Sequence, residues 1–227
     1  MSETKGSQLQ LQCLVNIREK ELTESVLSNS QSLLMYSEAI EWVSPLEEQH
    51  YKEYRDDFLE LLLKDEELQN ARQKLRQFWP ARGPVWDGIG VVHGETPQQK
   101  GLILVEAKSH LAETKSALKA KSLDSREKIM SRIVEVKAEL GSTSAVEVWT
   151  NQYYQMANRL CFLYFLNEKL GIPTWLVLCN FVNDTTHKST ELREWLKHQK
   201  DIWHQLGIQM DAKLMGKIIT IYPESIE

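Results

Sequence analysis

A β-hairpin is predicted in the middle of the chain, where two apolar runs flank a loop rich in turn-forming residues. The runs cover 86–93 and 101–107, and runs of this length bounded by turn signals are typical of paired strands. Further along, 174–182 is almost entirely apolar, which indicates a central strand covered on both faces of a sheet. The segment 217–222 predicts a last, shorter strand.

Helices are predicted on both sides of the hairpin, because apolar residues recur there at helical spacing. The clearest stripe lies in 46–63, and Pro80 stops the helix that follows it. The first residues are ambiguous, because Leu9, Leu11 and Cys13 alternate with polar residues and leave a short strand open. The predicted helices are 21–36, 38–43, 46–63 and 65–78 before the hairpin, and 109–120, 125–141, 145–170 and 190–206 after it.

These elements fit an α/β fold with a small mixed β-sheet flanked by helices. We expect a single domain over 1–227, with a mainly helical N-terminal part (1–80) and a sheet-containing core (81–227). Three widely spaced cysteines in apolar surroundings predict free thiols in a reducing, cytoplasmic environment. No apolar run approaches the length of a membrane span and no secretory leader is evident, so no membrane partner is expected.

The distribution of charge along the chain is more informative than the net charge. The net charge is −5, which is unusual for a protein that coats nucleic acid. Between residues 108 and 137, however, eight basic residues stand against four acidic ones, and this segment begins at the end of the predicted hairpin. Two interpretations stay open for the segment: a surface that faces phosphates, or the solvated side of a helix.

Charged residues at the base of the hairpin form the candidate site. Glu106 and Lys108 point the same way, about 7 Å apart, because side chains alternate along a strand. A hairpin folded between Thr96 and Pro97 places Asp87 opposite Glu106, where Cβ atoms are about 5 Å apart. Two carboxylates there repel, so we expect a divalent cation between them, with Lys108 beside it. On this argument, Glu106→Gln should raise the thermal stability of the metal-free protein.

At these residues the chain resembles a known group of proteins. An Asp at the start of one strand, followed by Glu-x-Lys at the end of the next, is the pattern of the PD-(D/E)XK nuclease-like superfamily. The words FWPARGPVWD, LVEAKSH and YYQMANRL are similar to those of an uncharacterised bacterial branch, and this longer resemblance covers roughly 77–183. The chain departs from the pattern in two ways. Asp87 follows Trp86 instead of a proline, and no strand is predicted ahead of the one that carries Asp87.

The resemblance implies a restriction-endonuclease-like core with an N-terminal helical extension, and a metal-dependent nuclease activity. Asp87, Glu106 and the backbone carbonyl of Ala107 would hold Mg²⁺ or Mn²⁺ through hard oxygen ligands. Lys108 would position the attacking water or neutralise the phosphate. The expected partner is nucleic acid, DNA ahead of RNA, and a homodimer is an arrangement that the superfamily commonly uses.

Three further side chains are candidates for substrate binding. The superfamily commonly places a Gln or a basic residue from the next helix near the site, which points to Gln155 and Arg159. A structural interpretation is equally open, in which Arg159 pairs with a carboxylate and Gln155 bonds to a loop. His110 continues the face of Glu106 and Lys108 if the strand extends, so it would touch substrate.

Two other interpretations of the site stay open. The chain could be an inactive nuclease-fold protein that binds nucleic acid or another protein, which its acidic net charge favours. Alternatively, Glu106 and Lys108 could form an ordinary surface ion pair, although the long apolar run into Glu106 argues against it. The sequence contains no glycine-rich phosphate loop and no Gly-x-Ser-x-Gly elbow, so nucleotide-fold and serine-hydrolase chemistry have no support.

Overall fold

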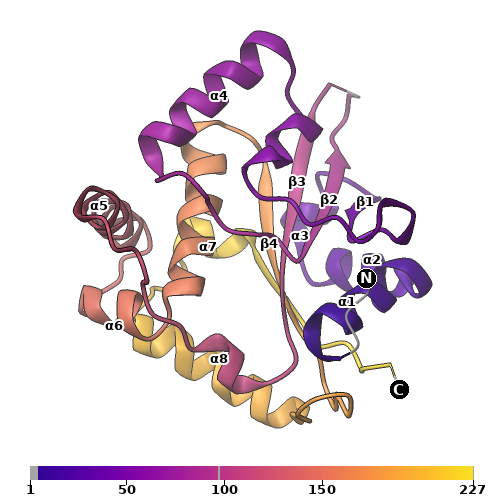
Figure 1. Ribbon diagram of the computed structural model, residues 1–227. Coiled ribbons are helices and arrows are strands. Elements are labelled where there is room, and N and C mark those ends of the chain that lie inside the picture. The colour runs from indigo at the N-terminus through magenta and orange to yellow at the C-terminus, as the bar shows by residue number, and fades with distance from the viewer. Residues whose placement is uncertain (1–4, 97, 227) are drawn as a thin grey trace.

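A mixed sheet lies at the centre of the computed structural model, which describes residues 5–96 and 98–226 (Figure 1). Over these residues the strands are β1 (Glu41–Ser44), β2 (Gly88–His93), β3 (Lys100–Lys108), β4 (Thr174–Asn180) and β5 (Ile218–Ile221), adjacent in that order. The first three pair antiparallel, whereas β3, β4 and β5 run parallel. The prediction of an α/β fold with a small mixed sheet flanked by helices is confirmed.

Helices cover both faces of this sheet (Figure 1). On one face lie α1 (Gly6–Ile17), α2 (Glu19–Ser28) and α3 (Gln31–Leu34); on the other lie α4 (Asp65–Phe78), α5 (Leu123–Glu139), α6 (Val146–Asn151), α7 (Tyr154–Tyr164) and α8 (Leu192–Leu206). Short 3₁₀ helices span Glu47–Gln49, Asp56–Leu61, Leu111–Thr114 and Lys213–Lys217, and a π-helical turn spans Phe165–Lys169. Each face of the sheet therefore has its own apolar core.

Strand β3 divides its side chains between the two cores. Val105 and Ala107 pack with α1–α3, whereas Leu104 packs with the helices of the opposite face. Because side chains alternate along a strand, Glu106 and Lys108 project toward the α7 side. These two charged residues thus enter a buried region between the sheet and α7.

The predicted register of the hairpin is confirmed. Gly88 pairs with Val105 and His93 pairs with Lys100, which is the register obtained by folding the chain between Thr96 and Pro97. Pro97 itself lies outside the described residues. The ladder ends at Gly88, two residues later than the start predicted for this strand. One further step along the same register brings residue 87 beside residue 106.

The structure corrects the prediction that no strand precedes the one near Asp87. Strand β1 occupies part of the segment predicted as helix 38–43, and it pairs antiparallel with β2. A strand of four residues is too short to show a period of two clearly, and its pairing with β2 overrides the weak local pattern. Near the N-terminus, where the sequence allowed either a helix or a short strand, the chain forms the helix α1.

The stripe over 46–63 is also corrected, because it is not one helix. His50 and Tyr51 both have left-handed backbone conformations (φ 55° each), which no α-helix continues through. Beyond them the Tyr54 carbonyl accepts a hydrogen bond from Trp86 N–H (2.9 Å). The apolar side chains still enter the core, since Phe58 is fully buried, but they do so from a 3₁₀ turn.

Two predictions after the hairpin are corrected as well. The segment 109–120 holds only a 3₁₀ turn, and α5 begins at Leu123, two residues before the predicted start, because Ser122 caps it. The predicted helix 145–170 is broken at residues 152–153. There the Ser116 carbonyl accepts from Tyr154 N–H (3.2 Å), so a partner from the preceding loop replaces a helical hydrogen bond.

The three cysteines are free thiols in the structure. Cys161 and Cys179 are buried, and burial raises the pKa of both thiols. Within the described residues, none of the helices combines the length and the apolar character that crossing a bilayer requires.

Candidate functional site

Asp87 lies at the base of the hairpin, in a bend directly before β2. Because Trp86 is paired with Tyr54, β2 does not extend past Gly88, and the N–H of Ala107 lacks a strand partner at that position. The side chain of Asp87 takes the place of that partner, since its Oδ2 accepts from Ala107 N–H at 2.8 Å. Asp87 is therefore fixed beside the residue that follows Glu106.

Glu106 is buried and neutralised by two cations. Its Oε2 lies 2.5 Å from Nε of Arg159, and its Oε1 accepts from the Nζ of Lys108. The side chains of Glu106 and Arg159 are only 5% and 6% exposed, and that of Lys108 is 13% exposed. Together with Asp87 the group holds two carboxyl groups and two cations, so the charges balance without any metal when Asp87 is ionised.

Arg159 ties α7 to the segment that leads into Asp87. Its Nη2 donates to the Val85 carbonyl and its Nη1 to Oδ1 of Asn158, both at 2.9 Å. The guanidinium also lies over the Trp86 ring, 4.8 Å from its centroid, where a cation–π attraction adds to the hydrogen bonds. Arg159 thus pairs with a carboxylate, as in the structural interpretation of this residue.

The environment shifts the pKa values of the two carboxyl groups in opposite directions. Burial and, after it, the negative charge of Glu106 together raise the pKa of Asp87 to about 7, although the cation of Lys108 opposes the rise. Burial also raises the pKa of Glu106, but the cations of Arg159 and Lys108 outweigh it and bring that pKa below the ordinary value. At neutral pH, Glu106 is therefore ionised while Asp87 is poised between its two forms.

A narrow pocket opens on the Glu106 and Lys108 side of β3. It is lined in part by Tyr153, Gln155, Asn180 and Gln199 along with these two residues. Two amide nitrogens there, Nδ2 of Asn180 and Nε2 of Gln199, are buried and have no hydrogen-bond partner among the described residues. Buried amide donors without acceptors cost free energy, so this pocket is suited to a group that supplies acceptor oxygens.

The structure places the remaining candidates in different surroundings. Gln155 reaches the pocket with its side chain, while its backbone N–H donates to Oγ of Ser116 in the preceding loop (2.7 Å). His110 does not line this pocket. Its Nε2 lies 3.1 Å from a carboxylate oxygen of Glu113, in a separate cluster beyond the end of β3.

The two pocket residues with unpartnered amide nitrogens were not predicted from the sequence. Asn180 ends the apolar run of β4 and pairs in register with Lys108, and a polar residue at the end of such a run was an available signal. Gln199 lies in the middle of α8, and no sequence pattern distinguishes it from the other polar residues of that helix.

Three oxygen donors belong to neighbouring residues at one end of β3. The N–H and C=O of one strand residue point to the same side, so the Ala107 carbonyl faces the side where Asp87 accepts from Ala107 N–H. Asp87, Glu106 and this carbonyl together form a donor set that fits Mg²⁺ or Mn²⁺. Each carboxylate oxygen has two lone pairs, so the ion pairs of Glu106 leave it able to accept a further partner.

Comparisons with known proteins do not assign this site to a family. The chain matches no protein-family model, no curated protein and no solved structure. The functional interpretation therefore rests on the site itself.

Proposed function

We propose that the protein is a Mg²⁺- or Mn²⁺-dependent nuclease that hydrolyses phosphodiester bonds, with DNA as the first substrate to test. The observation that carries this proposal is the hydrogen bond that holds Asp87 at the Ala107 N–H, next to Glu106 and its partner Lys108. When bound there, a divalent cation supplies Lewis acidity and lowers the pKa of a coordinated water.

The charge balance of the site favours an anionic substrate. Without a metal, the carboxylates of Asp87 and Glu106 offset the cations of Lys108 and Arg159. A divalent cation would leave an excess of positive charge in a buried region, and a phosphodiester group would offset part of it. Of the two cations at this site, Lys108 lines the pocket, so we assign it the contact with water or with the phosphate.

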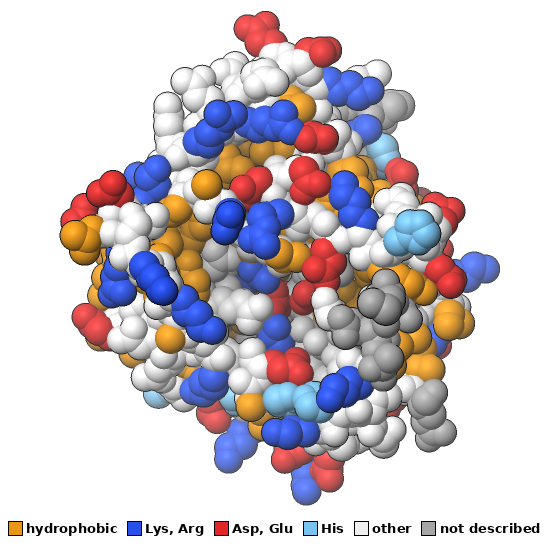
Figure 2. All heavy atoms as spheres, in the orientation of Figure 1, with side chains coloured by type: hydrophobic (Ala, Val, Ile, Leu, Met, Phe, Trp, Pro, Cys, Tyr) orange, Lys and Arg blue, Asp and Glu red, His pale blue; other side chains and the backbone are white. Residues whose placement is uncertain are grey.

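The pocket and the surrounding surface support a polyanionic ligand. The unpartnered amide donors of Asn180 and Gln199 would bind oxygens of the substrate next to Lys108. Figure 2 shows this side of the molecule hollowed near its centre, with Lys and Arg side chains around the hollow. Basic residues of α4 and α5 occur on this side of the sheet: Arg72, Lys74, Arg76, Arg126, Lys128 and Arg132. Such residues would contact the backbone of a nucleic acid.

The second candidate function is a nuclease-fold protein that binds nucleic acid without cutting it. The observation that favours it is the ion pair of Arg159 with Glu106, which satisfies this carboxylate without a metal. In that case the buried charges serve to hold α7 against β3.

Cleavage of a panel of single- and double-stranded DNA and RNA with Mg²⁺, Mn²⁺ or Ca²⁺ tests the proposal. The matched variant is Asp87→Asn, because an amide oxygen can still accept from Ala107 N–H while the charge is lost. Groups that merely orient metal ligands cost about 10–100-fold when removed, so loss of a ligand should lower the cleavage rate by roughly 100-fold or more.

The other outcomes separate the two candidate functions. Salt-dependent binding without cleavage in any metal would support the binding module instead. If the wild type neither cuts nor binds any member of the panel, both proposals are withdrawn.

A further inference from the structure

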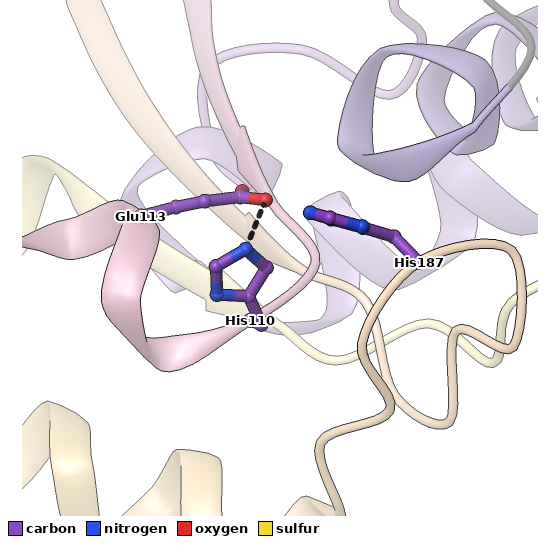
Figure 3. A group of neighbouring side chains, drawn as sticks. All are labelled: His110, Glu113 and His187. Atoms are coloured by element: carbon purple, nitrogen blue, oxygen red, sulfur yellow. Dashed lines mark ion pairs between the residues drawn. The ribbon is translucent and has the colours of Figure 1, made fainter.

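Three potential metal ligands converge beyond the C-terminal end of β3, outside the site already described (Figure 3). His110 and Glu113 belong to the segment that follows β3, whereas His187 belongs to the loop between β4 and α8. Figure 3 shows all three side chains directed toward a common space. One ligand atom from each residue lies within 4.8 Å of the other two, and Nε2 of His110 is 3.1 Å from Oε1 of Glu113.

Hydrogen bonds hold Glu113 in this arrangement. The N–H of Ser109 donates to its Oε2 at 3.0 Å, which leaves Oε1 directed at His110. A carboxylate fixed through one oxygen presents the other to a ligand, as carboxylates at metal sites do.

A buried carboxylate fixes the loop that carries His187. Asp184 is fully buried, and its Oδ1 accepts from both the backbone N–H and the hydroxyl of Thr186, at 3.0 and 2.6 Å. From α1, Gly6 N–H donates to Oγ1 of the same threonine at 3.0 Å. Because His187 directly follows Thr186, its backbone is held in place although its side chain is exposed.

We propose that His110, Glu113 and His187 form a second metal site, which binds a divalent transition metal and suits Zn²⁺ best. Two imidazole nitrogens and one carboxylate oxygen are ligands of zinc sites, whereas Mg²⁺ prefers oxygen ligands alone. The fourth position is left for water.

The distances require only a small closure of the site. Tetrahedral zinc with bonds of about 2.0 Å separates its ligand atoms by roughly 3.3 Å, and the His110–Glu113 pair is already at 3.1 Å. The exposed imidazole of His187 can approach by side-chain rotation. A bound ion would link the segment after β3 to the loop after β4, next to Lys108, independently of any nuclease activity.

Titration of the metal-free protein with Zn²⁺, and with Co²⁺ as a spectroscopic probe, tests this proposal. We expect one equivalent of Zn²⁺ to bind, Co²⁺ to give the absorption of a tetrahedral centre, and Zn²⁺ to raise the melting temperature. His187→Ala, which removes an exposed side chain, and Glu113→Gln, which keeps an acceptor for Ser109 N–H, should each weaken binding at least about tenfold. His204→Ala, at another exposed histidine, is the matched control and should bind as the wild type does.

Several outcomes would overturn the proposal. It fails if the wild type binds no Zn²⁺, or if His187→Ala and Glu113→Gln both retain wild-type affinity while their circular dichroism shows a native fold. It also fails if Asp87→Asn abolishes Zn²⁺ binding while His187→Ala retains it, because the ion would then occupy the candidate nuclease site. Failure of DNA cleavage has no bearing on any of these results, so the two proposals can be judged separately.

Discussion

Glu106 and Arg159 form an ion pair in the interior of the protein, between the end of β3 and α7, with 2.5 Å from Oε2 to Nε. From the sequence alone, Asp87 and Glu106 are expected to repel each other unless a metal ion binds between them. In the structure, Arg159 and Lys108 already neutralise Glu106, whereas burial and, after it, the charge of Glu106 raise the pKa of Asp87 to about 7. This asymmetry between the two carboxylates underlies the predictions that follow.

Arg159→Met should destabilise the protein by about 3–5 kcal/mol, because breaking a buried ion pair leaves an uncompensated charge. Urea unfolding at pH 8 measures the change. The control is Arg193→Met, whose pair with Glu191 is exposed and should contribute less than about 1 kcal/mol. Equal, small effects of both substitutions would show that the Arg159 pair has no special role in stability.

Glu106→Gln should lower stability in the absence of metal, which reverses the expectation from the sequence alone. The reason is that an amide leaves the buried cations Lys108 and Arg159 without their shared counter-charge. The same change should abolish any rise in melting temperature caused by Mg²⁺, because a ligand of the native state stabilises that state by RT ln(1 + [L]/Kd). An unchanged response to Mg²⁺ would remove Glu106 from the set of metal ligands.

Asp87→Asn should stabilise the metal-free protein in a pH-dependent manner. The pKa of Asp87 is about 7 in the folded protein, against 3.8 for an ordinary Asp, so the folded state binds this proton more tightly. Wild-type stability should therefore fall as the pH rises from about 4 to about 7 and level off above that. The variant should lack this loss, so its advantage should grow to the order of a few kcal/mol at pH 8.

Urea unfolding of both proteins at pH 5, 6, 7 and 8 and constant ionic strength measures this advantage. A difference that does not change with pH would contradict the raised pKa. If Mg²⁺ binds this carboxylate as proposed, it competes with the proton there, and added Mg²⁺ should reduce the pH dependence of the wild type.

Lys108→Ala should lower kcat for Mg²⁺-dependent cleavage by roughly 100-fold or more while metal affinity is kept or increased. Groups that position water or move a proton act mainly in the transition state, and they contribute about 10²–10⁴-fold. Lys20→Ala, at an exposed lysine of α2 on the opposite face of the sheet, removes the same charge and should leave kcat unchanged. Loss of metal binding in Lys108→Ala would instead mean that the lysine holds Glu106 in place.

Gln199→Met should preserve the fold and raise KM. The two side chains have similar shapes, and removing a buried donor that lacks a partner should stabilise the metal-free protein by about 1 kcal/mol. If the amide binds a substrate oxygen, its loss weakens substrate binding. Lower stability with unchanged KM would show that the amide serves the internal structure of the pocket.

The order of residues along the chain determined the hairpin and its register. The apolar runs at 86–93 and 101–107 and the position of the loop between them were sufficient to pair Gly88 with Val105, since both are local properties of one continuous segment. The apolar run at 174–182 likewise identified β4, because a strand covered on both faces needs no polar alternation. From this register alone, Asp87, Glu106 and Lys108 could be brought to one end of the hairpin.

Only the tertiary structure decided how these charges are compensated. Arg159 reaches Glu106 from a helix 53 residues away, and its alternative roles were indistinguishable in the sequence because any carboxylate could have been its partner. The same holds for β1, which is a strand through its pairing with β2, and for His187, which meets His110 only because β4 lies beside β3. A helix or strand can be predicted from its own sequence when the pattern of apolar residues within it is sufficient to favour that structure. Contacts between distant segments depend on how the segments pack together, and the sequence of one segment does not contain that information.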